Sequence, residues 1–152
     1  MAQRLARLLS LLACAGALAY AVFFLFGPTY QTCTTGAVPV TPGQPSATLG
    51  PTTCRSATFF EVQGGGPGGA ADLVRPLAFI ALWTVAPFVA LAGVSLRARA
   101  QVMGIALVAV ALLLDASSII SRGGGFVYAL LCGPLLLGAL IATIAMRPPQ
   151  MG

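Results

Sequence analysis

Four long hydrophobic stretches are separated by polar segments along the chain, and one of these polar segments is much longer than the others. The hydrophobic stretches cover residues 5–26, 77–96, 100–120 and 126–146. The hydrocarbon core of a bilayer is about 30 Å thick, so a helix needs about 20 mainly apolar residues to cross it. The pattern predicts an all-α integral membrane protein, a bundle of four transmembrane helices in a single domain over residues 1–152.

The overall composition supports this class. Hydrophobic residues make up 58% of the chain and charged residues only 7%, whereas about 25% of the residues of a soluble domain are charged. The first stretch also has features of a cleaved signal peptide, since Arg4 and Arg7 precede it and the residues up to Cys14 resemble a lipoprotein cleavage box. The apolar run continues to Phe26, beyond the usual signal-peptide core of about 7–15 residues. We therefore expect an uncleaved helix, and modification of Cys14 stays an open alternative.

The arginines predict the orientation, because positive residues in short loops favour the cytoplasm. One side of the predicted membrane carries five of them: Arg4, Arg7, Arg97, Arg99 and Arg147. The other side carries three: Arg55, Arg75 and Arg122. We expect a multi-pass protein of the plasma membrane with both termini in the cytoplasm and residues 28–75 as an extracytoplasmic loop. The net charge of +5 then comes mainly from arginines next to lipid headgroups, and it does not indicate a nucleic-acid partner.

The extracytoplasmic loop contains two of the four cysteines, Cys33 and Cys54. Disulfides form and persist in oxidising compartments, so we predict a bond between these two residues. Closing a loop of about 20 residues stabilises it by about 3 kcal/mol in the chain-entropy account. Two free thiols are the alternative. Cys14 and Cys132 lie within hydrophobic stretches, where a free cysteine behaves as a small apolar residue.

The residue types of the loop predict three local structures. Residues 29–35 and 58–62 are rich in Thr, Phe and Tyr, which predicts two short strands stapled by the disulfide into an irregular hairpin. Residues 37–51 contain four prolines and predict an extended, irregular segment, and residues 63–70 read as a glycine-rich tether. We expect the hairpin to rest on the outer ends of the helices, because two strands alone are marginally stable.

Asp115 is the only acidic residue within a hydrophobic stretch. Ionisable groups in membranes are costly and are functional candidates by default. Its spacing places Ser118 and Arg122 on the same helical face. The preferred interpretation is a structural ion pair with Arg75, with Arg122 as the alternative partner. A proton or cation site and simple solvent contact are the other two interpretations.

Small residues at four-residue spacing predict where the helices pack, since lipid provides no hydrophobic force between helices. The candidate positions are Ala13, Ala17, Ala21, Ala86, Ala90, Ala129, Gly133, Gly138 and Ala142.

Several classes of enzyme and transporter are disfavoured by missing residues. The chain has no histidine and no cluster of carboxylates, so we expect neither a catalytic site, a metal site nor a cofactor. Four-helix disulfide oxidases use a C-x-x-C pair, which neither Cys33 nor Cys54 forms. Small multidrug-resistance transporters use a carboxylate in the first span, and none is present in residues 5–26.

Two families resemble the chain. The long first outer loop with its cysteines is similar in topology to claudin-like tetraspan proteins, but their loop tryptophans are missing, since the only tryptophan is Trp83. The segments FGPTYQTC, ATFFEV and GGGFVYALLCGPLLLGALIA resemble small four-span membrane proteins of high-GC Gram-positive bacteria. That group implies a four-helix membrane fold and brings no known activity.

Two functions are compatible with these residues. The first is a non-enzymatic structural or accessory subunit, whose partners are the lipid bilayer and either another membrane protein or further copies of the chain. The alternative is a small transporter or channel that uses Asp115. The scarcity of polar residues in three of the four stretches favours the first, because a solute path needs polar lining groups.

Overall fold

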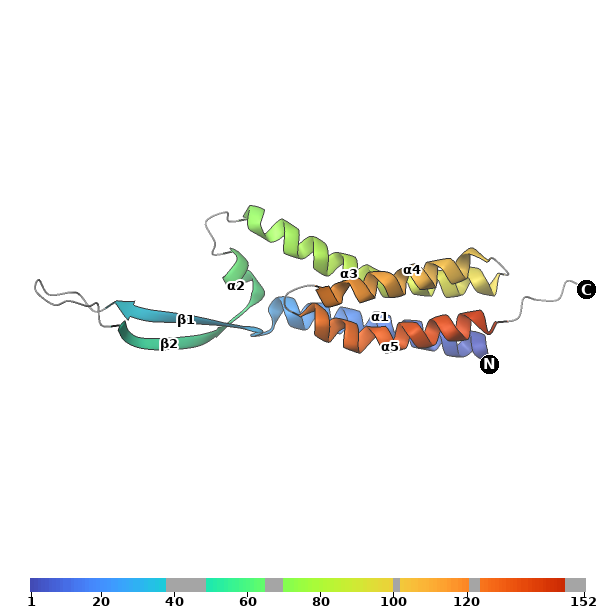
Figure 1. Ribbon diagram of the computed structural model, residues 1–152, viewed down its shortest axis with the longest axis horizontal. Helices are drawn as coiled ribbons and strands as arrows, with labels where there is room; N and C mark the ends of the chain where they lie inside the picture. The colour runs from blue at the N-terminus through green and yellow to red at the C-terminus, as the bar shows by residue number, and fades with distance from the viewer. Residues whose placement is uncertain (38–48, 65–69, 100–101, 121–123, 147–152) are drawn as a thin grey trace, which may run out of the picture. The chain divides into compact units, whose positions relative to one another are not determined.

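The computed structural model describes residues 1–37, 49–64, 70–99, 102–120 and 124–146. Their elements are, in order, α1 (Ala2–Phe26), β1 (Tyr30–Ala37), β2 (Leu49–Ala57), α2 (Phe59–Gly64), α3 (Ala70–Ala98), α4 (Met103–Ser117), the 3-10 turn η1 (Ser118–Ile120) and α5 (Gly125–Ile144) (Figure 1). The chain divides into two compact units. We call Met1–Val22 with Val74–Gly152 the helical unit, and Phe23–Leu73 the hairpin unit.

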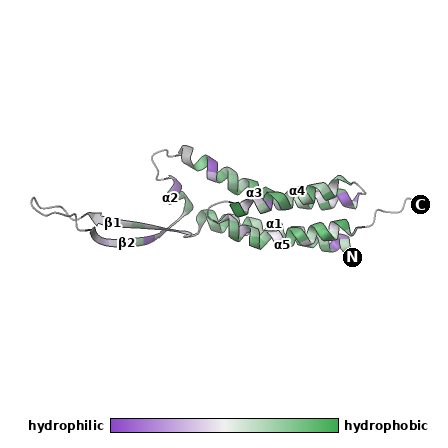
Figure 2. Ribbon diagram, viewed as in Figure 1, coloured by the Kyte–Doolittle hydropathy of each residue, from purple (hydrophilic) through white to green (hydrophobic). Residues whose placement is uncertain are grey.

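Four helical segments are long and apolar enough to cross a membrane: Ala2–Phe26, Leu73–Ala98, Met103–Ile120 and Gly125–Ile144. Figure 2 shows them mainly in the colours of hydrophobic residues. The four predicted hydrophobic helices are thus confirmed, and they fit a multi-pass membrane protein. The second begins earlier than predicted, because α3 already starts at Ala70 and continues through Pro76.

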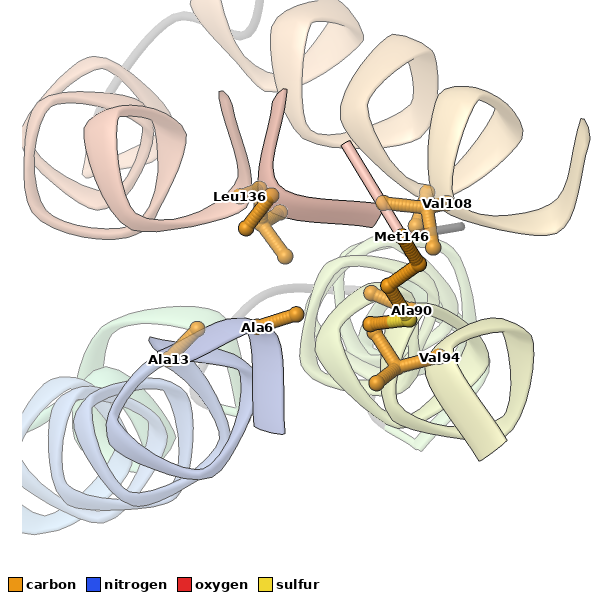
Figure 3. Packing of buried hydrophobic residues seen from close by; sticks show 9 residues of the cluster. Ala6, Ala13, Ala90, Val94, Val108, Leu136 and Met146 are labelled. Carbon is orange, nitrogen blue, oxygen red and sulfur yellow. The ribbon is translucent and has the colours of Figure 1, made fainter. Parts of the chain in front are cut away.

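The helical unit buries small side chains and exposes large ones. Its main cluster draws on α1, α3, α4 and α5 together with Met146 (Figure 3), and it comprises Ala6, Ala13, Ala90, Val94, Val108, Ala111, Leu136, Ala142 and Met146. Large apolar residues such as Leu8, Leu113 and Leu130 are exposed. Small residues let helix backbones approach closely, and outward-facing large ones suit lipid. Of the predicted packing positions, Ala13, Ala17, Ala86, Ala90, Ala129 and Ala142 are buried.

Helices α3 and α4 approach each other closely at Gly93 and Gly104, and this contact requires glycine at both positions. A Cβ atom at Gly93 would lie 2.7 Å from the carbonyl oxygen of Gly104. A Cβ atom at Gly104 would overlap the carbonyl oxygen of Gly93 and lie 2.5 Å from the backbone nitrogen of Arg97. Any larger residue at either position would push the two helices apart.

In the hairpin unit, β1 and β2 form an antiparallel two-stranded sheet. Cys33 lies directly opposite Cys54, and the register is irregular between Thr35 and Ala37. The first predicted strand, residues 29–35, matches β1. The second prediction was wrong in two respects: the strand is Leu49–Ala57, and residues 59–64 form the short helix α2.

A capping box explains why the chain turns into a helix after Ala57. The backbone N–H of Thr58 donates to Oε2 of Glu61 at 2.8 Å, and the backbone N–H of Glu61 donates to the hydroxyl oxygen of Thr58 at 3.4 Å. This reciprocal arrangement satisfies two amide groups at the start of a helix, which a strand would have left to other partners. Pro51 is tolerated in β2 because each strand of a two-stranded sheet is an edge strand.

Candidate functional site

Asp115 lies in the last turn of α4 and is only 2% exposed. Its Oδ1 atom has no hydrogen-bond partner among the described residues. Its other carboxyl oxygen, Oδ2, lies against α5, where a Cβ atom at Gly133 would be 3.0 Å away. The carboxyl group of Asp115 fits against α5 because Gly133 has no side chain at this position.

A cavity of about 230 Å³ adjoins Asp115 between α4 and α5. Apart from Asp115 its lining is formed by hydrophobic residues and one glycine, namely Leu112, Ala116, Ile119, Phe126, Ala129, Leu130, Gly133 and Leu137. Most of the larger of these side chains are exposed, including Ile119, Phe126, Leu130 and Leu137. Among the described residues, the cavity thus combines one carboxyl group with walls that provide no other charged group.

The structure does not bring together all the residues predicted to accompany Asp115. Ser118 is buried, and its hydroxyl donates to the carbonyl oxygen of Gly125 at 3.0 Å, which ties η1 to the start of α5. Arg75 is exposed on α3 and makes no ion pair with Asp115 in the described part of the chain. Arg122 lies outside the described residues. Pairing of Asp115 with an arginine therefore stays a prediction.

Two tyrosines in the helical unit form hydrogen bonds that the sequence did not indicate. The hydroxyl of Tyr128 donates to the carbonyl oxygen of Trp83 at 2.6 Å, and the two rings are stacked with centroids 6.2 Å apart. The hydroxyl of Tyr20 donates to the carbonyl oxygen of Gly124 at 2.6 Å. The first bond joins α5 to α3, and the second joins α1 to the residue that precedes α5. In the sequence, the only sign of these two hydrogen bonds was a tyrosine hydroxyl group within a hydrophobic stretch.

The four cysteines divide as predicted. Cys33 and Cys54 form the disulfide, with their Cα atoms 4.1 Å apart. Cys14 and Cys132 are free and buried. The thiol of Cys132 faces the carbonyl oxygen of Ala13 at 3.8 Å, which places it in the contact between α5 and α1.

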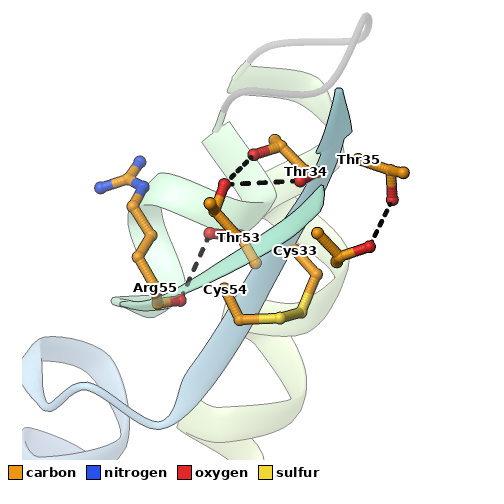
Figure 4. Close-up of a disulfide and its surroundings, with 8 residues drawn as sticks. Cys33, Thr34, Thr35, Thr53, Cys54 and Arg55 are labelled. Atoms are coloured by element: carbon orange, nitrogen blue, oxygen red, sulfur yellow. Dashed lines mark hydrogen bonds between the residues drawn. A yellow bond between two sulfur atoms is a disulfide. The ribbon is translucent and has the colours of Figure 1, made fainter. Parts of the chain in front are cut away.

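The hairpin around the disulfide carries threonines on both strands (Figure 4). The hydroxyl groups of Thr34 and Thr53 are 3.2 Å apart, as are those of Thr35 and Thr52. These four side chains and both cysteines are exposed. Among the described residues of the hairpin unit, no packed core lies under this part of the sheet. The backbone hydrogen bonds between the strands, the disulfide and the paired hydroxyls therefore hold it together.

At its other end the hairpin unit has a small aromatic core. Phe59 is 1% exposed, with its ring centroid 5.8 Å from that of Phe24 and 6.4 Å from that of Tyr30. Burial raises the pKa of the Tyr30 hydroxyl above its usual value. Phe60 remains exposed, and its ring lies 5.8 Å from that of Phe26. Phe59 is therefore a core residue, and Phe60 is available at the surface.

Glu61 interacts with polar groups of Thr58 and Arg55. The backbone N–H of Thr58 donates a hydrogen bond to the Glu61 carboxylate, and this bond holds the pKa of Glu61 below its usual value. The nearby positive charge of Arg55 lowers this pKa further. Arg55 and Glu61 form an ion pair at 3.5 Å, and it is the only ion pair among the described residues. Both side chains are largely exposed, so water weakens their attraction.

Within the described residues, no three His, Cys, Asp or Glu side chains are grouped so that they could hold a metal ion. Comparison with protein-family models, with curated proteins and with solved structures finds no match to the chain. Inferences about function therefore come from the geometry of the two units.

Proposed function

We propose that this protein is a non-enzymatic accessory subunit of the plasma membrane. Its four apolar helices act as an anchor, and its hairpin is the part that contacts another membrane protein or a further copy of the chain. The observation that carries this proposal is the hairpin itself, which is covalently closed although the side chains around its disulfide are exposed.

Such a hairpin is costly to order and gains little from burial. Two strands alone are marginally stable, and closing a loop of this length with a disulfide contributes about 3 kcal/mol. The stabilised surface consists mainly of threonines, with one exposed ion pair. It is neither strongly charged nor strongly hydrophobic.

The sheet also offers a mode of binding. It has only two strands, so each strand has one edge whose backbone groups are not used by the partner strand. An extended segment of another protein can pair with such an edge through main-chain hydrogen bonds. We propose that the hairpin lies outside the cell with both termini in the cytoplasm, which the distribution of arginines and the need for an oxidising compartment support.

Site-specific photo-crosslinking in native membranes tests this function. A photoreactive residue replaces Thr34 or Thr53 in the hairpin, and the control replaces Gln3, which is exposed on α1. We expect a discrete adduct with one protein, or with a second copy of the chain, from the hairpin positions only. The adduct should weaken when Cys33 and Cys54 are both changed to Ser. Equal adducts from Gln3, or none from the hairpin, would contradict the proposal.

A second function, transport through the helical unit, is favoured by one observation. Asp115 is buried beside a cavity, and its Oδ1 atom has no partner among the described residues. The hydrophobic lining of that cavity weighs against a path for polar solutes. If Asp115→Asn abolished flux into vesicles while the thermal stability in detergent stayed the same, transport would replace the accessory role as the better account.

A further inference from the structure

A second cavity lies at the end of the helical unit opposite Asp115. Its volume is about 330 Å³, and it is lined by Gln3, Arg7, Val94, Ser95, Ala98 and Arg99. The first two residues belong to α1, and the others come from the last turns of α3 and the residue that follows it. It is therefore a site between two helices, with an arginine from each side.

Among the described residues, no acidic side chain accompanies the two arginines of this cavity. Glu61 and Asp115, the acidic residues whose side chains the structure describes, do not line the cavity. Arg7 and Arg99 are exposed and form no ion pair with any described residue. Two arginines that have no ion-pair partner among the described residues thus line one small cavity.

Arg97 shows how an arginine at this end is used when it is part of the fold. Its Nη2 atom donates to the carbonyl oxygen of Met146 at 3.2 Å, which ties α3 to the end of α5. Arg97 does not line the cavity. At this end of the unit, Arg97 is therefore used to join two helices. Arg7 and Arg99 have no ion-pair partner among the described residues and are free to bind a ligand.

The other lining residues define what kind of group would fit. Gln3 and Arg7 are four residues apart and lie on one face of α1. Ser95 donates its hydroxyl hydrogen to the carbonyl oxygen of Leu91 at 2.9 Å, so that hydrogen is already used. Val94 and Ala98 provide an apolar wall. The cavity thus has Gln3 and Arg7 on the α1 side, and Arg99 beside the apolar Val94 and Ala98 on the α3 side.

We propose that this cavity binds a phosphate group, either the headgroup of an anionic phospholipid or a free phosphate ion. A guanidinium group matches two phosphate oxygens with parallel N–H donors, which makes arginine well suited to this ligand. Basic pockets between transmembrane helices on the cytoplasmic side are typical sites for anionic lipid headgroups. Binding of a phospholipid headgroup rests on the proposed membrane location of the protein, whereas binding of a free phosphate ion does not.

The test measures lipid binding to the full-length protein purified in a neutral detergent. Phosphatidylglycerol and phosphatidylcholine are added in equal amounts, and the lipid retained is counted by native mass spectrometry. We expect wild type to retain phosphatidylglycerol preferentially. Each of Arg7→Gln and Arg99→Gln should weaken that binding about fivefold, the factor for an attraction of about 1 kcal/mol per arginine.

Arg4→Gln is the matched control. Arg4 lies on the same helix, is exposed like Arg7 and does not line the cavity. The same loss of one positive charge should leave phosphatidylglycerol binding within about a factor of two of wild type. Equal losses for Arg4→Gln and Arg7→Gln would overturn the proposal, because they would indicate a diffuse charge effect and not a site.

Two further measurements complete the design. Titration with inorganic phosphate distinguishes the sources: displacement of the lipid at millimolar phosphate indicates a site for the free ion, and retention of the lipid indicates a headgroup site. Thermal unfolding without added lipid should be the same for all variants. If Arg7→Gln unfolds at a lower temperature than wild type, Arg7→Lys is measured as well. Arg7→Lys keeps the positive charge and should bind more phosphatidylglycerol than Arg7→Gln. Because all of this is done in detergent and does not involve the hairpin, its failure would leave the accessory role untouched.

Discussion

The helical unit and the hairpin unit are stabilised by different interactions, and each set suits a different solvent. In the helical unit the buried residues are mostly small, while large apolar side chains such as Leu113 and Leu130 face outward. Its hydroxyl groups mainly donate to backbone carbonyls, as Tyr128 does to Trp83. In the hairpin unit a disulfide, paired threonines and a capping box hold a structure whose side chains are mostly exposed.

This difference fits a chain whose helices lie in lipid and whose hairpin lies in water. Helix packing in lipid depends on close backbone approach, so a single added methyl group at a contact is harmful. A hairpin in water lacks burial and depends on covalent closure and local hydrogen bonds instead. Changes to one unit should therefore leave the other intact, and the following predictions test that separation.

The largest effect is expected at the contact between α3 and α4. Gly104→Ala places a Cβ atom against the carbonyl oxygen of Gly93, so we expect a loss of about 3 kcal/mol in the stability of the helical unit. Trp83 is the only tryptophan, and its fluorescence during unfolding in detergent reports on this unit.

The control for this substitution is Gly16→Ala. The nearest atom to its new Cβ would be Cδ2 of Leu131 at 3.6 Å, an ordinary contact. The higher helix propensity of alanine should then stabilise the protein by up to about 1 kcal/mol. Similar losses for the two variants would contradict the importance of the contact at Gly104.

A comparable effect, confined to the hairpin unit, is expected when the disulfide is removed. Changing both Cys33 and Cys54 to Ser should cost the hairpin about 3 kcal/mol. Trypsin should then cleave faster after Arg55, which is exposed on β2. The unfolding transition reported by Trp83 should not move, and a clear shift would show that the two units are not independent.

A smaller effect is expected where Asp115 meets α5. Gly133→Ala brings a Cβ atom to 3.0 Å from Oδ2 of Asp115, and this crowding disappears in the Asp115→Ala background. We expect a coupling of about 1 kcal/mol in the double-mutant cycle, measured by thermal unfolding in detergent. Additive effects would show that the carboxyl group can move away from α5. The same cycle with Arg75→Ala tests the predicted ion pair.

The smallest effect is expected from pH on the capping box. The hydrogen bond from the Thr58 N–H lowers the pKa of Glu61, so the folded hairpin favours the ionised carboxylate. A lowered pKa contributes stability above the unfolded value of about 4.3, and this contribution is lost as the pH falls through the folded value. In an NMR titration, the Thr58 amide resonance should therefore shift with a midpoint below about 4.3. A midpoint above the unfolded value would contradict the cap.

The sequence was sufficient to predict the four long helices, several of their packing positions and the disulfide. The four hydrophobic stretches became α1, α3, α4 and α5, because length and hydropathy alone define such helices. The small residues Ala13 and Ala90 are buried as their spacing predicted. The pairing of Cys33 with Cys54 followed from their being the only two cysteines in the polar loop.

Two kinds of feature were missed. The helix α2 was predicted as a strand because its phenylalanines have high β-propensity, although the T-x-x-E pattern from Thr58 to Glu61 was a local sign of a helix start. The contacts of Tyr128 with Trp83, and of Gly93 with Gly104, depend on how helices align in space. No pattern within one helix specifies its partner carbonyl. The surroundings of Asp115 could not be predicted for the same reason, since Asp115 on α4 lies against Gly133 on α5.

The central claim is that the hairpin unit is presented outside the cell while the helices remain in the membrane. Labelling of intact cells with a membrane-impermeant thiol reagent, before and after mild reduction, tests it most directly. We expect labelling of Cys33 and Cys54 only after reduction, with the buried Cys14 and Cys132 unlabelled throughout. Labelling of Cys33 and Cys54 only after the membrane is permeabilised would contradict the claim.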